Sequence, residues 1–121
     1  MKEPFGLYLI LTDPIAGYET CAKAAVDGGV RYLQLRMKGS PHAEVLETAK
    51  RLRQITRGTQ TRFIVNDDAA LAAEVEADGV HLGQSDGAVG RARMLLGDDK
   101  LIGDAGRDIL IGNQGDDKLV G

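Results

Sequence analysis

Polar and charged residues follow three short apolar runs of the sequence, at the points where those runs end. They are Gln34, Arg36, Lys38, Asn66, Asp67 and Asp86. Proteins hold Mg²⁺ through one or two carboxylates together with the phosphate oxygens of a substrate. Arginine and lysine neutralise the remaining phosphate charge through charge-assisted hydrogen bonds. This set of residues therefore fits a site for a diphosphate that is bound together with Mg²⁺.

A structural explanation of the same carboxylates stays open. Asp67, Asp68 and Asp86 each lie just before a stretch that favours a helix. Aspartate is a preferred N-cap, because its carboxylate accepts a hydrogen bond from a free N–H group of the first helical turn. No arrangement of a nucleophile with a base is apparent, since Cys21 and His81 both lie among apolar residues and are interpreted as packed side chains. We therefore assign no catalytic residue from the sequence.

Four strands are expected to bring the polar residues together. Short apolar runs predict strands, and alanine-rich or amphipathic stretches between them predict helices. The expected strands are residues 6–12, 30–36, 62–66 and 79–82, and the expected helices are residues 20–27, 41–58, 68–76 and 86–96. Ser40 is the expected N-cap of the second helix, with Pro41 at its first helical position. Strands that alternate with helices pair in parallel, so their carboxyl ends meet at one edge of the sheet.

Composition divides the chain near Gly97. Residues 1–96 hold 12 basic and 12 acidic residues, whereas residues 97–121 hold three basic and six acidic residues, so the net charge of −3 belongs to the second segment. We therefore expect two unlike parts, 1–96 and 97–121. No apolar run approaches the roughly 18 residues of a membrane span, and the acidic balance excludes a basic surface for nucleic acid. The single cysteine indicates a reduced, intracellular setting.

Four stretches of the first part closely resemble thiamine-phosphate synthase. They are YLILT at residues 8–12, LQLRMK at 33–38, FIVNDD at 63–68 and ADGVHLGQSD at 77–86. The resemblance runs from about Tyr8 to Gly97, and the motifs follow one another in the order of the family. It implies an α/β barrel of eight strands, which typically needs about 250 residues. These residues would form half of that TIM barrel, (βα)₄ with parallel strands.

The resemblance also implies a reaction and a set of site residues. The family joins the pyrimidine diphosphate HMP-PP to a thiazole phosphate, giving thiamine phosphate and releasing diphosphate. Its contacts with the pyrimidine diphosphate match Gln34, Arg36, Lys38 and Asn66. Its Mg²⁺ ligands match Asp67 and Asp86. The work of such a protein is electrostatic stabilisation of the leaving diphosphate. The resemblance implies a cytoplasmic transferase of thiamine biosynthesis.

The resemblance to the synthase stops at Gly97, where the fifth strand of the family would begin. The later strands of the family supply the thiazole-phosphate site and a further lysine, so we expect little or no activity from these residues alone. A half-barrel also leaves two open sheet edges and an uncovered interior, and open edges pair readily with other chains. We therefore expect the chain to associate with a second copy of itself that closes the barrel.

The second part repeats with a period of nine residues, each repeat beginning with Gly and carrying Asp two positions later. This pattern resembles the RTX nonapeptide, in which glycine-rich turns bind Ca²⁺ and short strands wind into a β-roll. The resemblance implies Ca²⁺ ligands at Asp99, Asp108 and Asp117. Two other interpretations stay open. The segment is a metal-free tail, or residues 100–102 and 109–111 are extra strands on the edge of the half-barrel.

The two resemblances point to different cellular settings, because RTX repeats usually belong to exported proteins. We therefore expect a recombined or designed chimera. Two functions follow from the sequence. In the first, the chain carries part of the magnesium–diphosphate site of a synthase and binds a small phosphorylated ligand. In the second, it is a non-enzymatic scaffold whose repeat segment binds calcium or mediates oligomerisation.

Overall fold

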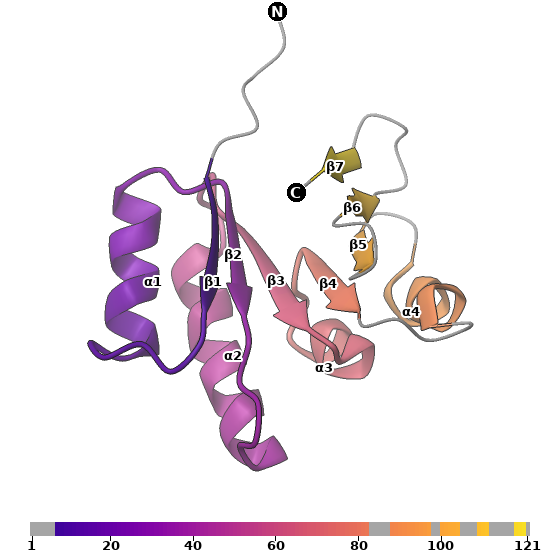
Figure 1. The fold of residues 1–121 in the computed structure, drawn as a ribbon, viewed down its shortest axis with the longest axis horizontal. Coiled ribbons are helices and arrows are strands. Elements are labelled where there is room, and N and C mark those ends of the chain that lie inside the picture. The colour runs from indigo at the N-terminus through magenta and orange to yellow at the C-terminus, as the bar shows by residue number, and fades with distance from the viewer. Residues whose placement is uncertain (1–6, 83–87, 98–99, 105–108, 112–117, 121) are drawn as a thin grey trace, which may run out of the picture.

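The structure is a computed structural model that describes residues 7–82, 88–97, 100–104, 109–111 and 118–120. Within these residues, seven strands form one sheet in the order of the sequence, and helices accompany its first strands (Figure 1). The strands are β1 (Tyr8–Leu11), β2 (Tyr32–Leu35), β3 (Arg62–Asn66), β4 (Gly79–Leu82), β5 (Leu101–Asp104), β6 (Ile109–Ile111) and β7 (Lys118–Val120). The helices are α1 (Tyr18–Asp27), α2 (His42–Thr56), α3 (Ala69–Glu74) and α4 (Ala88–Leu96).

The first five strands form a parallel sheet with one helix between each strand and the next. The first four strands with their helices confirm the predicted succession, and β3 and β4 have the predicted bounds. Strand β5 adds a fifth parallel strand beyond the four that were expected. The expected cap of α2 is wrong. Pro41 occupies the N-cap position with an extended ψ of 148°, and no side chain caps the helix. The helix therefore begins one residue later than the Ser-Pro pair suggests.

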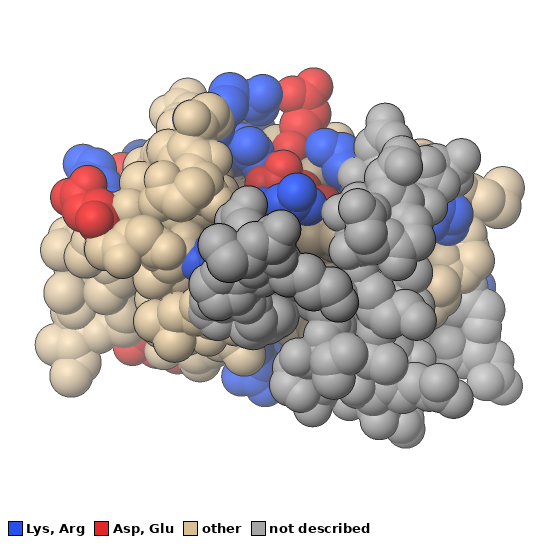
Figure 2. Space-filling view, turned by 90° about the horizontal axis from the view of Figure 1, so that it is seen from above, with Lys and Arg blue, Asp and Glu red and all other residues tan. Residues whose placement is uncertain are grey.

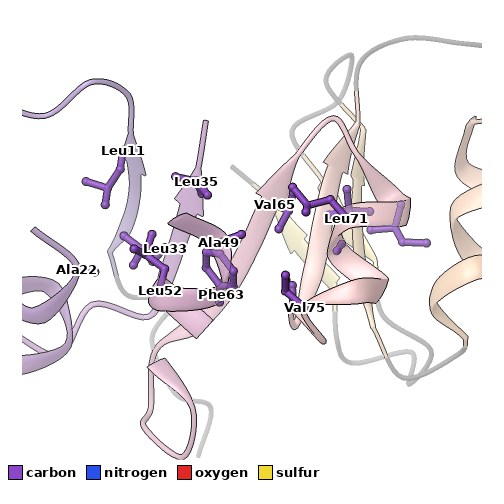
Figure 3. Close-up of a cluster of buried hydrophobic side chains, with 14 of the residues drawn as sticks. Leu11, Ala22, Leu33, Leu35, Ala49, Leu52, Phe63, Val65, Leu71 and Val75 are labelled. Carbon is purple, nitrogen blue, oxygen red and sulfur yellow. The ribbon is translucent and has the colours of Figure 1, made fainter. Parts of the chain in front are cut away.

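Alternation along the strands gives the sheet two different faces, as the pleat of a β-strand requires. The face toward the helices carries Leu33, Leu35, Phe63 and Val65, which belong to one buried cluster with helix residues such as Leu52 (Figure 3). The opposite face carries a second, smaller cluster made of Tyr32, Ile64 and Leu101, with Tyr8 packed against it. Side chains at the carboxyl ends of this second face are therefore free of the helices.

The repeat segment continues the sheet. Strand β5 pairs in parallel with β4, and β6 and β7 then follow in antiparallel pairing. The described residues of this segment thus form extra strands, which is one of the arrangements that the sequence left open. The expected Ca²⁺ ligands Asp99, Asp108 and Asp117 lie outside the described residues. The calcium site stays a prediction.

Asp78 ties three neighbouring strands together just before β4. Its carboxylate Oδ2 accepts hydrogen bonds from the backbone N–H of Phe63 at 2.8 Å and from Nη1 of Arg53 at 2.9 Å. Its backbone N–H donates to the carbonyl of Phe63, and its carbonyl accepts from the N–H of Leu101. Asp78 therefore bonds to β3 on one side and to β5 on the other. Through Arg53 it also holds α2 against these strands.

This junction lies at the amino ends of the strands, which Figure 2 views end-on. Basic and acidic side chains gather on this side of the molecule (Figure 2). Arg31, Arg53, Arg62 and Asp78 line a hollow of about 650 Å³ beside the last residues of α1 and α2. A helix carries partial negative charge at its carboxyl end, where cations are favourable. Arg53 lies in the last turn of α2 and pairs with Asp78, so we interpret this pair as structural.

Gly79 allows β5 to approach β4 closely. A Cβ atom at this position would lie 2.7 Å from the Cβ of Leu101 and closer still to the Leu101 carbonyl. Gly79 and Leu101 are partners in the register of the two strands, and both are buried. A side chain at residue 79 would therefore push β5 away from the parallel sheet.

Gly79→Ala is expected to lower the free energy of unfolding by about 1–3 kcal/mol, because overpacking forces backbone shifts in a close-packed interior. Gly90→Ala is the matched control. Gly90 lies within α4 with open space around its Cα, so alanine there should leave stability unchanged or raise it by up to about 1 kcal/mol. Urea denaturation of the two variants and the wild type measures both effects. Equal stability of the wild type and Gly79→Ala would contradict the close packing.

Candidate functional site

The carboxyl ends of β2 and β3 bring together the first group of predicted site residues. Gln34 lies on β2, and Asn66 is the last residue of β3. The Oε1 atom of Gln34 accepts a hydrogen bond from Nδ2 of Asn66 at 2.9 Å. Both side chains lie on the face opposite the helices, since Gln34 is in register with Ile64 and Asn66 follows Ile64 by two residues. The structure thus places two amide side chains in direct contact.

The two predicted cations, Arg36 and Lys38, come directly after β2 in the sequence. The N–H of Arg36 donates to the carbonyl of Leu11 at 3.0 Å, so parallel pairing continues one residue beyond the strand. Met37 packs against the cluster on the helix side of the sheet. Alternation then places Arg36 and Lys38 on the other side, with Gln34. Arg36 is half-buried and Lys38 is exposed.

The two neighbouring aspartates after β3 have different roles. Asp68 is the N-cap of α3, because its Oδ1 accepts a hydrogen bond from the N–H of Leu71 at 2.9 Å. Asp67 has a positive φ of 63°, and its N–H donates to the carbonyl of His81 at 2.6 Å. Its side chain is exposed at the end of the strand. Of these two, Asp68 is explained by helix capping and Asp67 is not.

His81 is a site candidate that the sequence interpretation assigned to packing. It is half-buried on β4 and is in register with Asn66, so it shares the face that carries the two amides. Val80 and Leu82 on either side of it are buried in the helix-side cluster. Alternation between two buried apolar residues is the signal that could have placed His81 on the open face. The predicted Mg²⁺ ligand Asp86 lies outside the described residues.

The donor set of the described site fits Mg²⁺ that is shared with a phosphorylated ligand. Among the described residues, no group of three or more His, Cys, Asp or Glu side chains comes together to hold a metal alone. Mg²⁺ does not require such a cage, because it keeps waters and binds through one or two carboxylates plus substrate phosphates. Asp67 supplies a carboxylate at the strand ends, and Arg36 and Lys38 supply positive charge nearby.

No helix in the described part of the chain is long and apolar enough to cross a membrane.

Comparison with known proteins gives one consistent result. The family model described as thiamine monophosphate synthase matches residues 7–109. The thiamine-phosphate synthase of Alcanivorax borkumensis is 46% identical over 102 residues, which cover 81% of this chain and 46% of the relative. That of Anaeromyxobacter dehalogenans is 44% identical over 106 residues, covering 86% of this chain and 46% of the relative. The chain spans about half the length of the curated relatives it matches.

A solved structure is similar over the same region. The thiamine phosphate pyrophosphorylase from Pyrococcus furiosus superposes with a TM-score of 0.71 at 35% sequence identity. The similarity covers 83% of this chain and 49% of that chain. The parallel sheet with its helices is therefore arranged as in that protein. The family match runs past the composition boundary at Gly97 and includes all of β5.

Asp68→Ala is expected to lower the free energy of unfolding by about 1 kcal/mol, the usual cost of losing an N-cap. Asp68→Asn should keep most of the stability, because asparagine caps a helix about as well as aspartate does. Thermal or urea denaturation distinguishes the two variants. If they are equally stable, the Asp68 cap contributes nothing and its side chain becomes a candidate for the site.

Proposed function

Because the chain belongs to the thiamine monophosphate synthase family, we propose that its strand-end residues bind a pyrimidine diphosphate together with Mg²⁺. The observation that carries this proposal is the contact between Gln34 and Asn66, with Asp67 directly after it. Residues from two separate motifs meet at one edge of the sheet. There they join a cation-bearing segment at Arg36 and Lys38.

The residues divide the work by their chemistry. The two amides orient the ligand, because their N–H and C=O groups offer directional hydrogen bonds. Arg36 and Lys38 neutralise phosphate oxygens through charge-assisted hydrogen bonds. Asp67 and Asp86 would hold Mg²⁺, which lowers the cost of the charge that develops on a departing diphosphate. This account needs no nucleophilic side chain, since preorganised charges supply the stabilisation.

The complete reaction enters this proposal only because the chain belongs to the family. In it, HMP-PP and a thiazole phosphate give thiamine phosphate and diphosphate. Our proposal concerns the part of this reaction in which the pyrimidine diphosphate and Mg²⁺ are bound. We expect these 121 residues alone to bind this ligand and to form little or no thiamine phosphate.

Isothermal titration with Mg²⁺ and inorganic diphosphate tests the binding proposal. The wild type is expected to bind diphosphate only when Mg²⁺ is present. Arg36→Met should weaken binding about tenfold or more, because a hydrogen bond to a charged group contributes about 1.5–3 kcal/mol. Asp67→Asn should reduce the effect of Mg²⁺ on diphosphate affinity, because it removes a carboxylate that would bind the metal.

Arg62→Met is the matched control, since Arg62 is an exposed arginine at the opposite end of the neighbouring strand. This substitution changes the net charge as Arg36→Met does. The affinity of the Arg62→Met protein for diphosphate should stay within about twofold of the wild type, because salt screens a distant charge. The proposal is wrong if the wild type shows no Mg²⁺-dependent binding. It is also wrong if both arginine variants lose affinity equally.

The second candidate function is a scaffold that associates with a second copy and whose repeat segment, 97–121, binds Ca²⁺. The observation that favours association is the free edge of the sheet. Strand β1 has a described partner on one side alone, and Ile10 on the strand and Leu7 just before it are exposed. Exposed apolar edge strands are sites for pairing with another chain.

Light scattering behind size exclusion tests the second function. The expected result is a mass of at least two chains, with Ca²⁺ changing the elution volume and Mg²⁺ leaving it unchanged. A monomer under every condition would overturn the association, and an elution volume that ignores millimolar Ca²⁺ would overturn the calcium part. Neither result bears on diphosphate binding.

A further inference from the structure

We propose that the hydroxyl group of Tyr8 is a positioning group that fixes the orientation of Gln34 and, through it, of Asn66. The inference deepens the proposed function, because Gln34 and Asn66 are its ligand-orienting residues. It adds a residue from β1, a strand that contributes none of the predicted site residues.

Three side chains from three adjacent strands form one line of hydrogen bonds. Nε2 of Gln34 donates to the hydroxyl oxygen of Tyr8 at 2.9 Å. Oε1 of Gln34 accepts from Nδ2 of Asn66, also at 2.9 Å. The amide of Gln34 is thereby held at its nitrogen by β1 and at its oxygen by β3. Each end of the amide has a partner that suits that end.

Burial makes the orientation of Gln34 matter. The residue is 2% exposed, so water is not at hand to replace a lost partner. A buried polar group that loses its hydrogen bond costs about 1–3 kcal/mol. Rotating the amide by half a turn would set its nitrogen against the Asn66 nitrogen, two donors facing each other. In the observed arrangement, the Tyr8 hydroxyl oxygen accepts from the Gln34 nitrogen and leaves the Gln34 oxygen for the Asn66 nitrogen. This arrangement decides which atoms of Asn66 remain for a ligand.

Packing fixes the ring that carries the hydroxyl. The Tyr8 ring stacks on Tyr32, with ring centroids 5.7 Å apart and planes 26° apart. Tyr32 is itself buried in the cluster that includes Ile64 and Leu101. Phenylalanine at residue 8 would keep this stacking and lose the hydroxyl alone. Tyr8→Phe is therefore a clean test of the hydroxyl group.

The first measurement is made without a ligand, on the side-chain amide groups of the ¹⁵N-labelled protein. In the wild type, we expect the Gln34 amide protons to exchange slowly with solvent and to show contacts with the Tyr8 ring. In Tyr8→Phe, the signals of both Gln34 and Asn66 should move and exchange faster. Tyr18→Phe is the matched control, since the Tyr18 hydroxyl bonds to Asp13 and its ring packs against the cluster on the helix side of the sheet. Unchanged Gln34 and Asn66 signals in Tyr8→Phe would overturn the inference.

The second measurement asks whether the orientation serves binding, with HMP-PP and Mg²⁺ as the probe. Tyr8→Phe should weaken binding of HMP-PP by about 5- to 30-fold, the equivalent of about 1–2 kcal/mol for one hydrogen bond. In a Gln34→Ala background, the same change should have little further effect, because the hydroxyl acts through Gln34. A full additional loss in that background would show that Tyr8 acts by itself and would overturn the positioning role.

The two measurements separate failure of the inference from failure of the proposed function. If wild-type protein does not bind HMP-PP, the proposed function fails, and the amide signals still decide whether Tyr8 orients Gln34. If the wild type binds HMP-PP and Tyr8→Phe binds it equally well, the proposed function stands and the role of Tyr8 in it is wrong.

Discussion

Hydrogen bonds in both directions across the sheet meet at Asp78, and the register of the later strands depends on them. Its carboxylate bonds to the N–H of Phe63 and to Arg53, and its carbonyl bonds to the N–H of Leu101. The side chains of Arg53 and Asp78 are 11% and 30% exposed, so their ion pair is partly shielded from water. Removing Asp78 would leave the charge of the less exposed Arg53 without compensation. Next to it, Gly79 lets β5 lie against β4.

The two ends of the same strands carry different kinds of charge arrangement. At the amino ends, the charges of Arg53 and Asp78 satisfy each other and hold α2, β3 and β4 together. At the carboxyl ends, Arg36, Lys38 and Asp67 extend beyond the strands, where a ligand can reach them. Register fixed at one end of a short strand is transmitted to its other end, because strands β3 and β4 are only five and four residues long. The position of Asn66 and Asp67 therefore depends on contacts made at the amino end.

Periodicity was sufficient to predict β1 to β4 and the edge at which Gln34 and Asn66 meet, but it left β5 and β6 as one alternative among several and did not predict β7. It predicted the bounds of β3 and β4, because each is an apolar run that ends abruptly in polar residues. It did not separate Asp67 from Asp68, since both precede a helix and the N-cap depends on backbone angles. Nor could it find the contact between Tyr8 and Gln34. That contact depends on the relative register of strands 26 positions apart in sequence, which the pattern within either strand does not contain.

Asp78 holds β3, β4 and β5 in register, and the positions of the residues at the other ends of these strands depend on it. Native-state hydrogen exchange of the Phe63 and Leu101 amides, in the wild type and in Asp78→Ala, tests this role most directly. We expect both amides to be protected in the wild type and to exchange faster in the variant. This role of Asp78 is wrong if the Leu101 amide of the wild type exchanges as fast as an exposed chain, or if Asp78→Ala leaves both rates unchanged.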